Sequence, residues 1–154
     1  MRIPIINQAM QNLSAFLDMI AWSEGTKGKG DDGYNVVVGG TLFSSYTDHP
    51  RKLVQLRAGL ASTAAGRYQL LAHEYDAYRK TLYLSDFCPA VQDVIAIQQI
   101  KECKAIASIS TGYIKDAIDL CAHIWASFPH ADYGQRENKL QDLLSVYKRY
   151  GGNL

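Results

Sequence analysis

Residues 10–25 read MQNLSAFLDMIAWSEG and predict the first element of the fold. Four apolar side chains recur there at helical spacing and form one stripe, namely Leu13, Phe16, Leu17 and Ile20. Glu24 lies four residues beyond Ile20 and so extends this apolar stripe, while Gly25 is a typical helix stop. An apolar surrounding and the carboxyl end of the helix dipole both favour the protonated carboxyl, the form that a general acid needs. We therefore predict a helix over residues 10–24 that presents Glu24 as a candidate catalytic acid.

The composition is that of an ordinary globular protein. The 154 residues are 47% hydrophobic and 20% charged, with a net charge of +1, and a chain of this length buries a sizeable core. The balanced charge argues against a nucleic-acid-binding protein. No run approaches the ~18 apolar residues of a membrane span, and no signal peptide is visible. We expect a single domain over residues 1–154, with no membrane anchor.

The rest of the chain predicts an α+β fold. Polar, glycine-rich residues 25–33 predict a loop, and residues 34–43 predict a β-hairpin that turns at Gly39-Gly40. Residues 44–63 predict irregular structure. Helical spacing returns from Ala64 and predicts helices near residues 64–82, 90–100, 114–125 and 140–147. The helix at 90–100 is apolar on more than one side, so we expect it to be central and buried. The sum is a mostly helical domain with one small antiparallel sheet early in the chain.

Other motifs are weak. The glycines of residues 28–33 match a dinucleotide fingerprint, but they follow a helix and precede a strand, which is the reverse of the required order. The four histidines are scattered and offer no metal-ligand spacing. The three cysteines lack a CxxC spacing, and two of them fall inside apolar helical patterns, where a buried free thiol is expected; the three are Cys88, Cys103 and Cys121.

Seven short segments carry a family resemblance over nearly the whole chain. They are AWSEGT at 21–26, GYxVxVGG at 33–40 (x marks positions that do not carry the resemblance), DHPRKLV at 48–54, AGRYQLL at 65–71, DAYRK at 76–80, IWAS at 124–127 and YGQ at 133–135. In this order they closely resemble the lambda-type phage endolysins. That resemblance implies a lysozyme-like fold and a lytic transglycosylase that cleaves the β-1,4 bond between N-acetylmuramic acid and N-acetylglucosamine, leaving a 1,6-anhydro ring.

The resemblance also implies which residues act. The family's catalytic glutamate falls on Glu24, which would serve as acid and then as base. One carboxyl suffices because the attacking C6 hydroxyl is already tethered to the substrate. Substrate-binding positions are implied at Tyr34, Asn35, Arg67, Tyr68, Gln69, Ser127, Tyr133 and Gln135.

The same resemblance implies the setting in which the enzyme works. It implies peptidoglycan glycan strands as the partner, and no cofactor or metal. We expect a monomer that stays in the host cytoplasm until a phage holin gives it access to the periplasm and cell wall.

Two departures keep alternatives open. Asn35 stands where the family has an aspartate, and the loop over residues 25–33 is shorter than in the family. A hydrolytic muramidase of the same fold would need a second carboxylate, for which Asp31 or Asp32 is available. A non-catalytic peptidoglycan-binding protein is a third hypothesis, and Asn35 alone suggests it.

Overall fold

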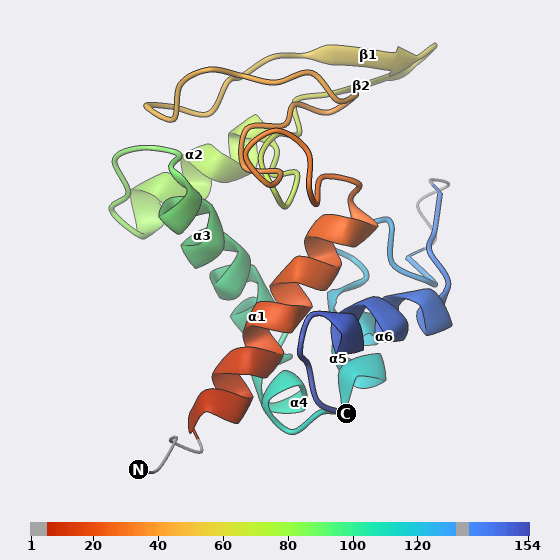
Figure 1. Ribbon diagram of the computed structural model, residues 1–154. Coiled ribbons are helices and arrows are strands. Elements are labelled where there is room, and N and C mark those ends of the chain that lie inside the picture. Colours follow the sequence, from red (N-terminus) through yellow and green to blue (C-terminus); the bar gives the residue numbers. More distant parts are fainter. Residues whose placement is uncertain (1–5, 132–135) are drawn as a thin grey trace. The chain divides into compact units, whose positions relative to one another are not determined.

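The computed structural model describes residues 6–131 and 136–154, and the fold over these ranges is mostly helical (Figure 1). The elements in chain order are α1 (Ile6–Ser23), β1 (Val54–Arg57), β2 (Leu60–Ser62), α2 (Ala72–Thr81), α3 (Pro89–Glu102), α4 (Ile106–Ser110), α5 (Ile114–Cys121) and α6 (Leu140–Arg149). β1 and β2 form one two-stranded antiparallel sheet. The predicted α+β class is confirmed.

The chain divides into two compact units, and the chain passes from one to the other at the Ser23–Glu24 peptide bond. The first unit holds Met1–Ser23 and Ile97–Leu154, and the second holds Glu24–Ala96. The expectation of a single domain stays a prediction. No helix within residues 6–131 and 136–154 combines the length and apolar character that crossing a membrane requires.

The predicted apolar stripe is the buried face of α1. Phe16 and Ile20 are fully buried, Leu17 is nearly so, and Leu13 at the edge of the stripe is half-buried. In the first unit this face packs against α4 and α6. The helix ends at Ser23, and the left-handed backbone of Gly25 follows it, as expected for a glycine that stops a helix.

The predicted hairpin at residues 34–43 is present, but its register is wrong. Val36 bridges Leu42, and the pair is flanked by bonds from the Val37 N–H to the Thr41 carbonyl at 2.7 Å and from the Phe43 N–H to the Asn35 carbonyl at 2.9 Å. The other edge of the same segment pairs with residues 64–66, because the Val38 N–H donates to the Ala64 carbonyl at 2.9 Å and the Val36 carbonyl accepts the Gly66 N–H at 2.8 Å. These are the two backbone groups that the predicted register would pair across the hairpin.

The regular sheet lies instead within the stretch predicted to be irregular. β1 and β2 are joined at Ala58-Gly59, where Gly59 has φ +76°. Most side chains of this hairpin are exposed, so its strands lack the inside–outside alternation by which a half-buried strand is predicted.

Three helices also differ from expectation. α2 begins at Ala72 and not at Ala64, because the preceding residues form a bridged turn in which Gly66 and Gln69 have positive φ. α4 was not predicted, since five residues are too few to show a period. α3 is not buried on every side, because Val94 is 46% exposed.

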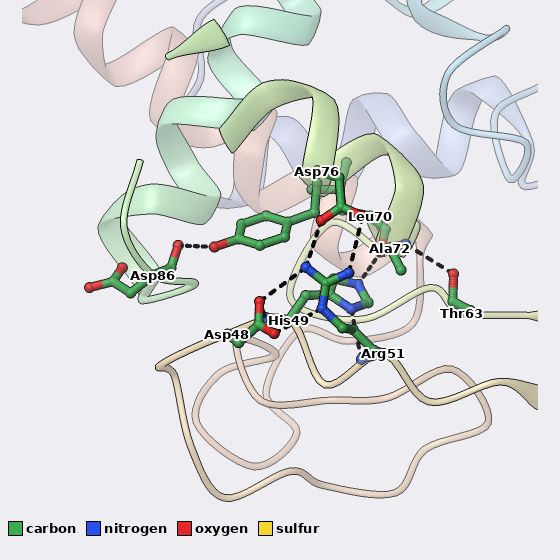
Figure 2. A network of polar contacts seen from close by, with 9 residues as sticks. Asp48, His49, Arg51, Thr63, Leu70, Ala72, Asp76 and Asp86 are labelled. Carbon is green, nitrogen blue, oxygen red and sulfur yellow. Dashed lines mark hydrogen bonds and ion pairs between the residues drawn. The ribbon is translucent and has the colours of Figure 1, made fainter. Parts of the chain in front are cut away.

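A polar network around His49 fixes the start of α2 in the second unit (Figure 2). His49 is 2% exposed, its Nε2 lies 2.8 Å from the Leu70 carbonyl oxygen, and its Nδ1 accepts the Arg51 N–H at 2.9 Å. A neutral ring with its proton on Nε2 satisfies both bonds. Figure 2 shows the Arg51 guanidinium joined to both Asp48 and Asp76 beside this ring.

We expect this histidine to make the fold sensitive to mild acid. Burial lowers the pKa of His49, and the charge of Arg51 adds to this effect, while the Leu70 carbonyl and the two aspartates oppose it. The unfolded chain takes up the proton near its usual pKa of about 6.5 and the native chain does not, so stability is full above that pH and falls below it. Urea unfolding at about pH 7.5 and about pH 5 measures the loss.

The His49→Gln variant should lose part of this pH dependence, because it keeps an amide donor but cannot titrate. His73→Gln is the matched control, since His73 is exposed. Equal pH dependence of the wild type and the His49→Gln variant would contradict this account.

Candidate functional site

The backbone that precedes Glu24 is held by side chains of the first unit. The Asn138 amide nitrogen donates to the Ser23 carbonyl at 3.1 Å and to the Ser23 hydroxyl at 2.9 Å. The Ser23 hydroxyl also lies 2.7 Å from that of Ser127. These bonds satisfy a carbonyl at the C-terminal end of α1 that has no partner within the helix. Ser127, a predicted sugar contact, is thus a neighbour of the residue before the predicted acid.

The backbone that follows Glu24 is held within the second unit. Thr26 is buried, and its hydroxyl donates to the Arg67 carbonyl at 2.6 Å. Glu24 is half-buried, and Thr26 anchors the backbone after it within the second unit, to which Glu24 itself belongs. A backbone held in this way is what a positioned general acid requires.

Arg67 lies inside the second unit, with 4% of its surface exposed. Its guanidinium donates to the Asp32 carbonyl at 3.0 Å, to the Asp32 carboxylate at 3.3 Å and to the Tyr68 hydroxyl at 3.0 Å. The same group lies over the rings of Tyr34 and Tyr68, with its central carbon 5.2 and 5.6 Å from the ring centroids. Because a buried guanidinium is costly unless it is fully bonded, these contacts explain how the fold tolerates it.

Asp32, in the glycine-rich loop, forms an ion pair with Arg67 in which the arginine is buried and the aspartate side chain is 45% exposed. Burial raises the pKa of its carboxyl, but bonds from the Gly28 N–H and the Lys27 ammonium and the charge of Arg67 outweigh it, so the pKa is lowered overall. The Lys27 ammonium lies 3.1 Å from this carboxylate. Asp32 is therefore an ionised group that two cations already hold.

Two tyrosines of the predicted site converge on Asp93, a residue that the sequence did not single out. The hydroxyls of Tyr34 and Tyr68 both donate to Oδ1 of Asp93, at 2.9 and 2.7 Å. Burial and this carboxylate raise the pKa of Tyr34 to about 12. Burial and the same carboxylate also raise the pKa of Tyr68. Both phenols are therefore protonated at neutral pH.

Gln92, the residue before Asp93 on α3, joins three segments of backbone. It is 3% exposed, and its carbonyl oxygen accepts the Arg67 N–H at 2.9 Å. Its amide nitrogen donates to the carbonyls of Tyr34 and Phe87, each at 2.9 Å. Gly66 is required beside it, because a Cβ there would lie 2.4 Å from the Gln92 carbonyl oxygen and φ is +83°.

The remaining predicted contacts on the second unit are also hydrogen-bonded within it. The Gln69 amide nitrogen donates to the Gly66 carbonyl at 2.9 Å. The Asn35 side-chain oxygen accepts the Asp31 N–H at 2.7 Å, and Asp31 in turn accepts the Tyr46 hydroxyl at 2.6 Å.

Tyr133 and Gln135 lie outside the described residues. A contact of any of these residues with substrate stays a prediction. Over residues 6–131 and 136–154, no group of three or more His, Cys, Asp or Glu side chains is arranged to hold a metal ion.

Comparisons with known proteins agree with the predicted resemblance. The Endolysin family model matches residues 14–154. The endolysin of Escherichia phage lambda is 55% identical over 144 residues, which are 91% of each chain. The endolysin of Escherichia phage P2 is 45% identical and covers 97% of this chain and 98% of its own.

Solved structures agree as well. Bacteriophage lambda lysozyme complexed with a chitohexasaccharide matches with a TM-score of 0.92 and 53% identity, over 94% of this chain and 96% of that one. A second structure of lysozyme from bacteriophage lambda matches with a TM-score of 0.87 and 52% identity over the same shares. The predicted lysozyme-like fold is confirmed.

Proposed function

The chain belongs to the Endolysin family, and from this membership we propose that it is a peptidoglycan lytic transglycosylase that opens the bacterial cell wall for host lysis. The observation that carries the proposal is the half-buried Glu24, followed by the buried Thr26 that anchors its backbone within the second unit. Solved relatives are lysozymes of the same fold, and one of them holds a chitohexasaccharide. A glycan substrate is therefore the expectation for this chain.

In the proposed reaction Glu24 acts first as an acid and then as a base. Its neutral carboxyl protonates the glycosidic oxygen as the bond to C1 of the muramic acid breaks. The C6 hydroxyl of the same sugar attacks C1, and the Glu24 carboxylate takes the hydroxyl proton. The enzyme returns to its starting protonation state, and no water is consumed.

The substrate contacts proposed for this reaction are those that the family resemblance implies. Glu24 and most of the proposed substrate-binding residues belong to the second unit. Ser127 belongs to the first unit, and Tyr133 and Gln135 lie outside the described residues. The phenol oxygen of the half-buried Tyr34 suits a donor group of a glycan, whereas the phenol of Tyr68 is buried and bonded to Asp93 and Arg67. No cofactor enters the proposed chemistry, and release by a holin and a monomeric state remain proposals.

A hydrolytic muramidase is the second candidate, because it would use an ionised carboxylate such as Asp32. The two cations that hold Asp32 favour the first candidate, since a base bonded to Lys27 and Arg67 is poorly placed to activate water. Asp31 is likewise bonded to Tyr46.

Mass spectrometry of soluble fragments from purified peptidoglycan tests the proposal. We expect fragments that end in 1,6-anhydro-muramic acid, lighter by one water than hydrolytic products. Reducing muramic acid ends would support the muramidase. The absence of new glycan ends would contradict both enzymes and favour the peptidoglycan-binding protein.

A further inference from the structure

Asp93 on α3 is the shared acceptor for two phenols of the candidate site. One carboxylate oxygen takes the only hydroxyl proton of Tyr34 and the only one of Tyr68. The two rings meet edge to face, with centroids 6.4 Å apart. A charged acceptor forms stronger hydrogen bonds than a neutral one, so this carboxylate fixes both rings.

The two phenols differ in what they can still offer to a ligand. Tyr68 is buried, and its oxygen also accepts a bond from the Arg67 guanidinium at 3.0 Å, so its role is internal. Tyr34 is half-buried. Because its proton is committed to Asp93, its oxygen can act toward a ligand only as an acceptor. A sugar hydroxyl or an acetamido N–H is a donor that such an acceptor suits.

We propose that Asp93 is a substrate-positioning residue that orients Tyr34 as a hydrogen-bond acceptor for a glycan donor group, an inference that rests on the proposed function. Asp93 acts through Tyr34 and needs no contact with the substrate. The sequence alone could not show this, because the two residues are 59 positions apart. The backbone of Tyr34 is fixed separately by Gln92 at 2.9 Å, so the loss of Asp93 should disturb the ring more than the chain.

The test compares Asp93→Leu, which removes the acceptor, with Asp93→Asn, which keeps an amide oxygen in its place. Asp116→Leu is the matched control, since Asp116 is an exposed aspartate on α5. We expect Asp93→Leu to raise the KM for purified sacculi and weaken chitohexaose binding about tenfold, the effect of one charge-assisted hydrogen bond. We expect kcat to change much less, and Asp93→Asn to restore most of the affinity.

A double-mutant cycle separates positioning from general stability. Tyr34→Phe alone should weaken binding about as much as Asp93→Leu, and the two together should cost little more than either, because both remove one interaction. In an ultraviolet titration, the Tyr34 phenol should ionise at a lower pH in the Asp93→Asn variant than in the wild type. Its signal is identified because the Tyr34→Phe variant lacks it. This readout applies even where Asp93→Leu fails to fold.

Three results would overturn the inference. They are unchanged KM and affinity in a folded Asp93→Leu variant, fully additive effects in the cycle, and an unchanged tyrosine titration in Asp93→Asn. The proposed function fails separately. The wild type could release no glycan fragments and still bind chitohexaose in a manner that depends on Asp93. That result would contradict the proposed enzymatic activity and support the positioning role of Asp93.

Discussion

Glu24→Gln should lower the rate of fragment release from purified sacculi by about a thousandfold or more, because general acid–base groups commonly contribute 10²–10⁴-fold and Glu24 fills both roles. Glutamine has nearly the same shape but cannot donate an acidic proton. The side chain is half-buried, and the backbone bonds at Ser23 and Thr26 do not involve it. Because glutamine also keeps the size of the side chain, we expect the variant to fold, which urea unfolding measures.

Asp142→Asn is the control for this experiment, since Asp142 is an exposed carboxylate in the first turn of α6. It should retain full activity. If Glu24→Gln kept more than about a tenth of the wild-type rate, Glu24 could not be the acid, since even the weakest general acids contribute more than this. Asp31→Asn and Asp32→Asn would then be the next variants to compare.

Gln92→Leu should destabilise the chain by about 4 kcal/mol, the second large effect that we expect. Leucine has a similar volume, so little cavity is formed. The substitution leaves the Arg67 N–H and the carbonyls of Tyr34 and Phe87 without their partner in a buried place. Each buried polar group left unpaired costs roughly 1–3 kcal/mol. Urea unfolding at constant pH measures the loss.

Gln98→Leu on the same helix is the matched control. The Gln98 amide binds the Glu102 carboxylate at an exposed position, so its loss should change stability by no more than about 0.5 kcal/mol. Equal effects of the two substitutions would show that Gln92 does not join the segments as we describe.

The first helix could be predicted because it depends on local spacing, whereas the role of Glu24 as the acid stays a prediction. The apolar stripe of α1 and the glycine after Glu24 are readable within 16 residues. The register of the hairpin at 34–43 is wrong for the opposite reason. The residues do have strand propensity, but Val37 also pairs with Ala65, which is distant in the sequence. Strand propensity carries no information about such a partner.

The polar centre of the second unit could not be predicted in the same way. Gln92 and Asp93 are two of six polar residues in α3, so the sequence alone presents them as part of an ordinary polar face. Their partners come from Tyr34, Arg67 and Tyr68, and only the fold brings these together. Gly66 is required because it lies against the buried Gln92 side chain. The sequence does not reveal this contact, so the pair could be recognised only from the structure.

The most direct test of the central claim is digestion of purified peptidoglycan in water labelled with the heavy oxygen isotope, followed by mass spectrometry of the fragments. An internal attack by the C6 hydroxyl consumes no water, so our account predicts anhydro-muramic ends without label, and none of these ends with Glu24→Gln. Heavy oxygen at C1 of the muramic acid would contradict the transglycosylase and show that water is the nucleophile.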